Sequence, residues 1–347
     1  MHTIRVLVVE DSYVFREVLV RALSKVEGIE VVATARDAYQ ARDAILEYKP
    51  DVMTLDLELP KMSGLEFLEK LIPQYPLPVV VISSLNDKVF DAMKAGAVDF
   101  VVKPFEQSRE AIHAFAMKEL PEKIVIASTA YVGSRKRVEK EKKEVTSIPQ
   151  KIPHTLGKDF VVALGASTGG TEATAHVLKE LPENMPGMVI VQHMPKGFTE
   201  MYANRLNQQS RLQVKEAKTG DLVLPGTVLI APGGDAHMEL VNMNGTFQVR
   251  IKKAPKVNGH CPSVDVLFHS EANQAKNQAL GIILTGMGGD GAKGLLEMRQ
   301  AGAHTIGQDA STCVVYGMPK VAFDLGAVEY QEKLQNIAKR TCQILQL

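Results

Sequence analysis

A serine in a glycine-rich turn is the first residue of this sequence that could act as a nucleophile. Residues 160–173, FVVALGASTGGTEA, predict a strand, a tight turn and a helix start, with Ser167 in Gly-x-Ser-x-Gly spacing. Such a turn exposes the hydroxyl beside helix-terminal amides that can stabilise an oxyanion. A glycine turn of this kind also binds phosphate, and the motif alone supports both interpretations equally. The sequence disfavours nucleotide binding, because Ser167 replaces the second glycine of GxGxxG and no P-loop lysine follows.

Residues that could activate this serine follow two later strands. His193 ends the predicted strand 187–193, and Asp290 lies in the glycine-rich loop after the apolar segment 280–284. Because the carboxyl ends of parallel strands share one sheet edge, we expect Ser167, His193 and Asp290 to meet there as nucleophile, base and orienting acid. The chain order Ser, His, Asp differs from that of α/β-hydrolases, which predicts a different scaffold.

Other residues compete for these two roles. The remaining candidates are His237, His260, His269 and His304 for the base, and Asp235 and Asp309 for the acid. Position at a strand end is the only reason to prefer His193. Asp290 also has a simpler interpretation, as a turn residue whose side chain binds loop backbone.

Polar residues also mark the strand ends of the first 105 residues. Glu10 and Asp11 end the first predicted strand, Asp56 the third, Ser83 the fourth and Lys103 the fifth. Clustered carboxylates repel one another unless a divalent cation neutralises them, and their oxygens suit magnesium. A phosphoryl group on Asp56 could then be held by the metal, the lysine ammonium and the serine hydroxyl. Each acid alone could be a solvated loop residue, but five such residues at four strand ends favour a site.

Both halves of the chain alternate strand-like and helical segments. This rhythm predicts an α/β fold with two doubly wound, mainly parallel sheets, flavodoxin-like in the first half and Rossmann-like in the second. We expect one domain over residues 1–120, a linker over 121–157 and a second domain over 158–347. The run 134–154 is charged and contains prolines, as linkers do. Asn244-Gly245 predicts an antiparallel hairpin in the second domain.

The composition of the 347 residues excludes several classes of protein. Hydrophobic residues make up 45% and charged residues 23%, which fits neither a disordered chain nor a membrane bundle. The net charge of zero argues against nucleic acid as the main ligand. Three widely spaced cysteines indicate neither a disulfide framework nor a zinc site. We expect a cytoplasmic monomer that does not insert into membranes.

Residues 4–105 resemble a response-regulator receiver domain. The motifs VVED, DLELPKMSG, SS and VKPF stand where that family has its acid pair, phosphoacceptor, hydroxyl residue and Lys-Pro turn. The resemblance implies that Asp56 accepts a phosphoryl group from a histidine kinase. It also implies Mg²⁺ bound by Glu10, Asp11, Asp56 and the backbone carbonyl of Glu58, with Ser83, Phe100 and Lys103 as switch residues. The short segment between residues 84 and 95 predicts a trimmed fourth helix.

Residues 160–330 resemble the catalytic domain of chemotaxis protein-glutamate methylesterases, the CheB family. The motifs GASTGG, QHMPKGFT, PSVDVLFHS, LTGMGGDGAKG and CVVYGMP occur in the family's order. The resemblance implies Ser167 as nucleophile, His193 as base and Asp290 as orienting acid, and the backbone amide of Met287 as an oxyanion donor. We add the Thr168 amide as a further donor. The loop APGGDAH departs from the family pattern, which leaves the role of His237 open.

Together the two resemblances imply an enzyme controlled by phosphorylation. It would hydrolyse glutamate methyl esters, and deamidate glutamines, on cytoplasmic helices of methyl-accepting chemoreceptors. A CheA-type histidine kinase would be the phosphodonor, and the esterase site would need no cofactor. The main alternative is an inactive, phosphorylation-controlled module that only binds receptors. A transcriptional regulator is disfavoured because the second half lacks a helix-turn-helix pattern.

Overall fold

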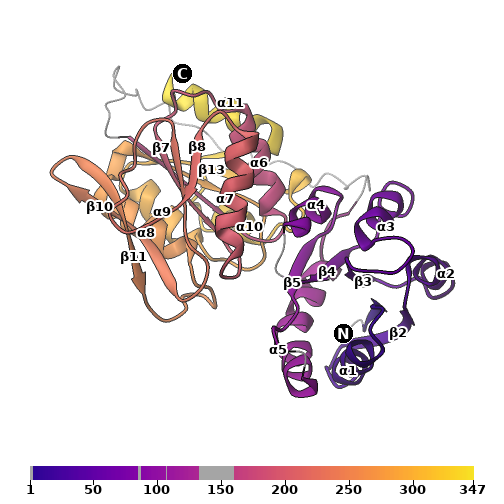
Figure 1. Cartoon of the computed structure of the whole chain (residues 1–347). Helices are drawn as coiled ribbons and strands as arrows, with labels where there is room; N and C mark the ends of the chain where they lie inside the picture. Colours follow the sequence, from indigo (N-terminus) through magenta and orange to yellow (C-terminus); the bar gives the residue numbers. More distant parts are fainter. Residues whose placement is uncertain (1–2, 85–86, 107, 133–159) are drawn as a thin grey trace. The chain divides into compact units, whose positions relative to one another are not determined.

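The computed structural model describes residues 3–84, 87–106, 108–132 and 160–347 (Figure 1). The chain divides into two compact units, Met1–Lys136 and Arg137–Leu347. Residues 133–157 of the predicted linker lie outside the described residues. None of the helices described here combines the length and apolar character needed to cross a membrane.

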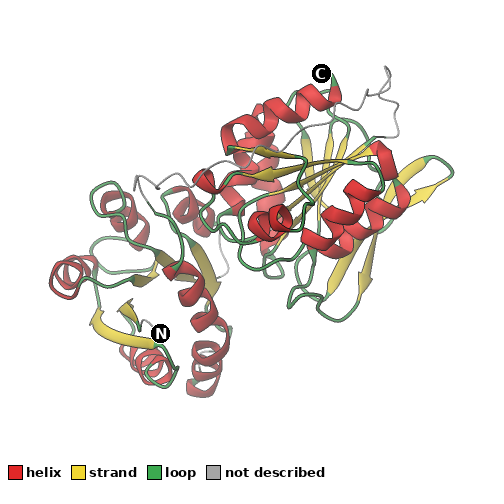
Figure 2. Cartoon of the chain, turned by 180° about the vertical axis from the view of Figure 1, so that it is seen from behind, coloured by secondary structure: helices red, strands yellow, loops and turns green. Residues whose placement is uncertain are grey.

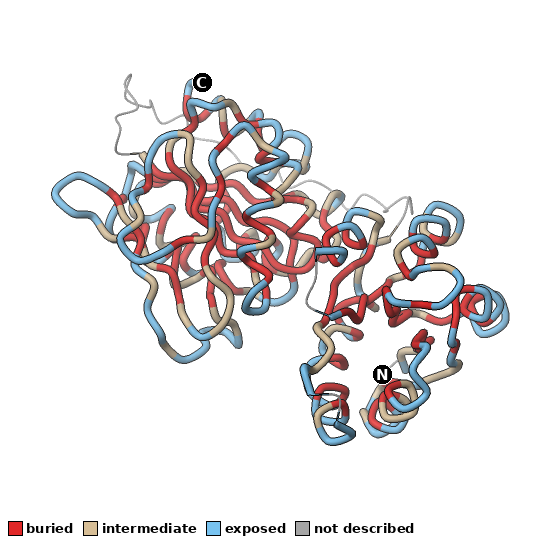
Figure 3. The backbone as a smooth tube through the Cα atoms, viewed as in Figure 1, coloured by how far each residue is buried: buried red, intermediate tan, exposed pale blue. Residues whose placement is uncertain are grey.

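The first unit is a five-stranded parallel sheet in the order β2-β1-β3-β4-β5. Its strands are β1 (Ile4–Val9), β2 (Ile29–Ala35), β3 (Val52–Asp56), β4 (Val79–Ser83) and β5 (Asp99–Val102). Its helices are α1 (Tyr13–Leu23), α2 (Ala38–Tyr48), α3 (Gly64–Leu71), α4 (Lys88–Lys94) and α5 (Arg109–Ser128). The central strands β3 and β4 are buried along their whole length (Figure 3), as expected for a parallel sheet with both faces covered. The predicted flavodoxin-like fold is confirmed.

Side-chain caps explain where most of these helices begin. Ser12, Asp37, Ser63 and Ser108 each accept a hydrogen bond from the backbone N–H three residues later. Helix α4 has only seven residues, which agrees with the predicted trimming of this segment. All predicted strand ends of the acidic site are observed, because Glu10 and Lys103 directly follow β1 and β5 and Asp56 and Ser83 close β3 and β4.

Helix α5 corrects the predicted start of the linker. We expected the linker from residue 121, but the helix continues to Ser128 with Pro121 inside it. Leu120, Ile124 and Ala127 are buried, and this spacing keeps one apolar face towards the receiver core beyond the predicted boundary. Burial of this face therefore outweighs the charged composition that suggested a linker.

The second unit contains a seven-stranded parallel sheet in the order β14-β13-β12-β6-β7-β9-β8 and a separate hairpin. Its strands are β6 (Val161–Ala166), β7 (Gly187–Gln192), β8 (Gln213–Glu216), β9 (Thr227–Ile230), β10 (Ala236–Met243), β11 (Thr246–Lys253), β12 (Ala279–Ile283), β13 (His304–Gln308) and β14 (Tyr330–Glu332). Its α-helices are α6 (Gly170–Glu180), α7 (Phe198–Gln209), α8 (Val264–Gln274), α9 (Ala292–Gln300), α10 (Met318–Asp324) and α11 (Leu334–Leu345). Short 3₁₀ turns cover Lys276–Gln278 and Ala310–Thr312.

One face of this sheet forms a continuous hydrophobic core with α8, α9, α10 and the hairpin β10–β11. Figure 2 shows the strands of the sheet in yellow with helices in red around them. Alternate residues of β6 and β7, such as Val161 and Val189, point into this core. The hairpin is antiparallel and turns at Asn244-Gly245, where both residues have positive φ angles of 54° and 90°. The predicted hairpin and Rossmann-like architecture are therefore confirmed.

Candidate functional site

The second unit brings three predicted site loops to one edge of its sheet. Strands β12, β6 and β7 are neighbours, and the strand order reverses between β6 and β12. Ser167 follows β6, His193 follows β7 and the loop with Asp290 follows β12. Open α/β sheets bind their ligands at such a switch point, beyond the carboxyl ends of the strands.

Ser167 lies in a tight, well-held turn. Its N–H donates to the Thr285 carbonyl at 3.0 Å, and its own carbonyl accepts from the Gly170 N–H at 2.7 Å. Gly169 has a φ of +76°, and a Cβ there would lie 2.6 Å from the Cβ of Val314. The turn therefore requires glycine at this position. Ser167 is 9% exposed, and its hydroxyl makes no hydrogen bond to any described residue.

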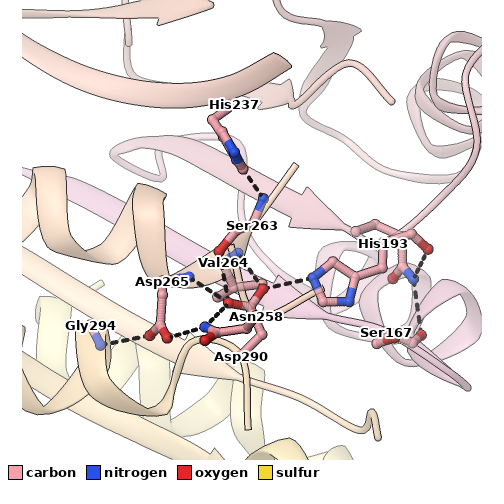
Figure 4. Close-up of polar contacts among 10 residues, drawn as sticks. Ser167, His193, His237, Asn258, Ser263, Val264, Asp265, Asp290 and Gly294 are labelled. Atoms are coloured by element: carbon pink, nitrogen blue, oxygen red, sulfur yellow. Dashed lines mark hydrogen bonds and ion pairs between the residues drawn. The ribbon is translucent and has the colours of Figure 1, made fainter. Parts of the chain in front are cut away.

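His193 is hydrogen-bonded to Asp290 through one ring nitrogen. Its Nε2 lies 2.8 Å from Asp290 Oδ2 (Figure 4), whereas Nδ1 is buried and has no hydrogen-bond partner within the described parts of the chain. In the neutral ring the carboxylate selects the tautomer with the proton on Nε2, because a carboxylate can only accept. The Nδ1 lone pair is then available as a base.

Asp290 accepts hydrogen bonds from several groups besides His193. Oδ1 accepts from the Ser263 hydroxyl at 2.7 Å and the Asn258 amide at 2.9 Å, and Oδ2 accepts from the Val264 N–H at 2.7 Å. Burial on its own would raise the pKa of Asp290. The hydrogen bond and charge of His193, with the bonds from Asn258 and Ser263, instead hold it well below its ordinary value. The carboxylate is therefore ionised and fixed in orientation.

The segment 257–265 supplies further site residues, among them His260, which the sequence offered only as a competing base. The ring of His260 stacks on that of His193, with centroids 3.8 Å apart and planes at 10°. The Asn258 amide bridges Asp290 and Asp265, and Asp265 accepts from the Gly294 N–H at 2.7 Å (Figure 4). The motif PSVD was the available signal, because it places a serine and an aspartate at the start of a helix.

The other three competing histidines do not contact His193. His237 is buried, its Nδ1 accepts from the Ser263 N–H and its Nε2 donates to the Pro255 carbonyl, so both ring nitrogens are occupied. It supports Ser263, which in turn binds Asp290. His269 and His304 pair with Glu297 and Glu329.

The competing aspartates also bind groups outside this network. Asp235 forms a surface ion pair with Lys253, and Asp309 accepts from the N–H of Ser311 at the start of a 3₁₀ turn. Among the candidates named from the sequence, Asp290 is thus the acid that the structure joins to His193.

The predicted oxyanion donors lie on the two loops beside the serine. The Met287 N–H follows Gly286, where an added Cβ would lie 2.7 Å from Ser167 Cβ, so this backbone is close to the serine. No described residue accepts a hydrogen bond from this N–H. The Thr168 carbonyl accepts from the Thr285 hydroxyl at 3.0 Å, which ties the two loops together.

The first unit brings the predicted phosphorylation residues together at the edge of its own sheet. Oxygens of Glu10, Asp11 and Asp56 lie within 4.8 Å of one another. Such a set of carboxylates fits a hard divalent cation like Mg²⁺. Lys103 Nζ donates to Asp56 Oδ2 at 2.7 Å and lies 3.1 Å from Glu10 Oε2, an atom that makes no hydrogen bond with the described residues.

The remaining switch residues are placed by their strands. Ser83 is buried at the end of β4, and its carbonyl accepts from the Lys103 N–H at 2.9 Å. Phe100 lies on β5 and is also buried. The Glu58 N–H donates to Asp56 Oδ1 at 3.0 Å, which orients the carboxylate. The role of the Glu58 carbonyl as a metal ligand stays a prediction.

The charge state of Glu10 makes the stability of the first unit depend on pH. Burial, followed by the nearby Asp56 carboxylate, raises the pKa of Glu10 from 4.5 to about 7, although Lys103 opposes the shift. The folded state therefore binds a proton that the unfolded state has lost between these two values. Stability from this group is full below pH 4.5 and is lost as the pH rises through about 7.

We expect the thermal transition of the first unit, measured in EDTA, to fall between pH 6 and pH 8. Glu10→Gln should flatten this slope, because the amide does not titrate, whereas the exposed Glu66→Gln should keep it. Mg²⁺ should raise the transition more at pH 8, because binding needs the ionised carboxylate. An unchanged slope in Glu10→Gln would show that another group causes it.

Comparisons with known proteins agree with both halves of this description. Residues 162–341 match the family model of the CheB methylesterase, and residues 6–114 that of the response regulator receiver domain. A protein-glutamate methylesterase/protein-glutamine glutaminase of Syntrophomonas wolfei is 53% identical, covering 99% of this chain and 98% of that protein. One from Syntrophotalea carbinolica is 48% identical with the same coverage.

A solved structure extends the likeness to the fold of the second unit. The CheB methylesterase catalytic domain of Thermotoga maritima matches with a TM-score of 0.52 and 40% identity, covering 54% of this chain and 98% of that domain. The chain therefore belongs to the CheB methylesterase family and carries a response regulator receiver domain before its catalytic domain.

Proposed function

We propose that this protein hydrolyses γ-glutamyl methyl esters on the cytoplasmic helices of methyl-accepting chemoreceptors, under control of its receiver domain. The hydrogen bond of 2.8 Å between His193 and Asp290, beside Ser167 at the sheet switch point, is the observation that carries this proposal. The full-length relatives named protein-glutamate methylesterase/protein-glutamine glutaminase support the same reaction class. The cytoplasmic location and monomeric state stay predictions.

Acylation begins at the Ser167 hydroxyl. His193 Nδ1 takes its proton as the oxygen attacks the ester carbonyl, and the resulting imidazolium is stabilised by the Asp290 carboxylate. The carbonyl oxygen becomes an oxyanion, which the Met287 and Thr168 N–H groups stabilise. His193 then gives its proton to the departing methoxide, so methanol leaves and a glutamyl ester of Ser167 remains.

Deacylation reverses these roles with water as the nucleophile. His193 removes a proton from water, the hydroxide attacks the glutamyl-serine ester and the proton returns to the Ser167 oxygen. The receptor then carries a glutamate carboxylate. If the substrate is a glutamine, the same steps release ammonia in place of methanol, so deamidation needs no additional group.

The receiver domain supplies the control. Mg²⁺ bound by Glu10, Asp11 and Asp56, with the Glu58 carbonyl, would neutralise charge as Asp56 accepts a phosphoryl group from a CheA-type histidine kinase. Lys103 is already paired with Asp56, and Ser83 ends the neighbouring strand. Both would rearrange around the larger phosphoryl anion, and this change would favour the active state of the enzyme.

Methanol release tests this function directly. The full-length protein is mixed with a methylated chemoreceptor cytoplasmic fragment from its own organism, with and without a small phosphodonor and Mg²⁺. We expect methanol release that the phosphodonor stimulates. No release from folded protein under any of these conditions would contradict the esterase proposal and favour a module that only binds receptors.

Asp56→Asn should separate control from chemistry. Asparagine lacks the nucleophilic oxygen, so we expect no covalent phosphorylation and no stimulation of methanol release by the phosphodonor. Asp51→Asn is the matched control, because its carboxylate binds the Arg5 N–H away from the acidic cluster. Stimulation that persists in Asp56→Asn would show that another residue accepts the phosphoryl group or that control does not use it.

A further inference from the structure

Gln192, the last residue of β7, binds the backbone of both predicted catalytic residues. Its Nε2 donates to the Ser167 carbonyl at 2.9 Å and to the His193 carbonyl at 3.3 Å. The side chain is 2% exposed, so water does not compete for these bonds. One buried amide thus links the turn after β6 to the residue after β7.

The hydrogen bond from Gln192 to the Ser167 carbonyl also affects the orientation of the next N–H group, that of Thr168. That carbonyl belongs to the same planar peptide as the Thr168 N–H, and in a trans peptide the two groups point in opposite directions. Gln192 Nε2 and the Gly170 N–H hold the carbonyl from one side, at 2.9 and 2.7 Å. Holding the oxygen therefore fixes the direction of the Thr168 N–H, one of the two expected oxyanion donors.

Gly170 shows how closely the amide fits. A Cβ at this position would lie 2.4 Å from Gln192 Oε1, so any other residue would displace the glutamine side chain or the turn. Gln192 Oε1 itself is buried and accepts no hydrogen bond from the described residues. Burying an acceptor without a partner costs stability. A methionine of similar length would avoid that cost, so the distinctive contribution of the glutamine is its N–H donor.

We propose that Gln192 is a positioning residue that orients the Thr168 N–H towards the oxyanion formed during hydrolysis. The proposal rests on the esterase function proposed above. Gln192 does not contact the reacting atoms; it acts through the Ser167 peptide. Its effect should therefore be confined to the charged tetrahedral state and should leave substrate binding unchanged.

The test compares Gln192→Met with the wild type in the full-length chain, with phosphodonor and Mg²⁺ present. We expect kcat for methanol release to fall about 10- to 100-fold, less than for complete removal of an oxyanion donor, with KM within twofold. A receptor peptide can carry a trifluoromethyl ketone at the target side chain. The Ser167 oxygen adds to the ketone carbonyl carbon, and the carbonyl oxygen becomes a tetrahedral oxyanion. The affinity for this ketone peptide should fall by the same factor as kcat, while affinity for the glutamate product peptide stays constant.

Two further variants make the result interpretable. Gly170→Ala keeps Gln192 in the chain but places a Cβ 2.4 Å from its Oε1 and 2.6 Å from the Cβ of Ala166, so it should displace the amide and the turn and lower kcat and ketone affinity at least as much. Gln274→Met removes a glutamine that accepts from the Asn242 N–H outside the site, and should leave both unchanged.

The possible outcomes separate the two proposals. A folded Gln192→Met that keeps kcat within twofold would overturn the positioning role, as would equal losses of affinity for ketone and product. If Gln192→Met does not fold, Gly170→Ala decides on the same criteria. A folded wild type that neither releases methanol nor binds the ketone would overturn the esterase function and the positioning role together.

Discussion

Ser167→Ala should lower methanol release by about ten-thousand-fold or more, to the residual level that oxyanion donors and binding alone can give. Alanine removes the oxygen that is proposed to form the acyl-enzyme, and in the turn between β6 and α6 only Thr168 carries another hydroxyl. The assay follows methanol release from the methylated receptor fragment with phosphodonor and Mg²⁺ present. Mass spectrometry of the ketone adduct should show no covalent product in the variant.

Ser167→Ala should leave the free energy of unfolding unchanged. The Ser167 hydroxyl makes no hydrogen bond to the described residues, and its turn is held by backbone groups and by Gln192. Ser270→Ala is a useful contrast, because that hydroxyl accepts from the Leu240 N–H and donates to the Leu267 carbonyl. It should cost about 1 kcal/mol of stability while leaving kcat unchanged. Ser167→Ala activity within tenfold of the wild type would identify a different nucleophile.

Strand ends explain how much of the site could be predicted from the sequence. Parallel strands are buried on both faces, so they appear as apolar runs whose final residues are easy to locate. Their carboxyl ends share one edge of the sheet, and this rule alone places Ser167, His193 and Asp290 together. The same argument places Glu10 and Asp56 in the first domain. The structure confirms both folds, while the roles of these residues await the variants.

The parts that could not be predicted depend on loops rather than on strands. Asn258 and Ser263 lie in a segment between the hairpin and α8 whose path follows no periodic pattern, as does His260, which the sequence offered only as a competing base. Their contacts with Asp290 and His193 therefore appear only in three dimensions. Gln192 was overlooked for a different reason. It closes an apolar strand, and its function lies in a bond to the backbone of a residue 25 positions away.

The C-terminal end of α5 could not be predicted from amino-acid composition. The predicted linker begins at residue 121, but the helix continues to Ser128 and residues such as Ile124 and Ala127 are still buried. Helix α1 lies against α5, and the rings of Phe15 and Phe115 are 6.3 Å apart. Burial against the rest of the first unit, which composition does not report, therefore keeps this segment helical beyond residue 121.

Asp290→Asn should have the second-largest effect, a loss of about 10³- to 10⁴-fold in kcat, as expected when a triad base loses its orienting carboxylate. Every group that hydrogen-bonds to Asp290 is a donor: Ser263, Asn258, the N–H groups of Val264 and Asp265, and His193 Nε2. In either orientation, the NH₂ group of the asparagine therefore points at one or more of these donors, which as oriented here do not accept a hydrogen bond from it. If it faces His193, it favours the tautomer with the proton on Nδ1, which cannot accept from Ser167.

In the other orientation, the asparagine oxygen faces His193 and its NH₂ faces Ser263. The His193 ring is then less disturbed, but the negative charge beside it is still lost. The Ser263 hydroxyl can rotate to accept from the NH₂, which keeps the His193 ring in place with a neutral acceptor. The imidazolium formed during acylation then lacks a negative partner. Asp265→Asn is the matched control, because this carboxylate binds Asn258 and the Gly294 N–H but not His193. A loss as large in Asp265→Asn would mean that the network acts by holding the loop, and not through the charge of Asp290.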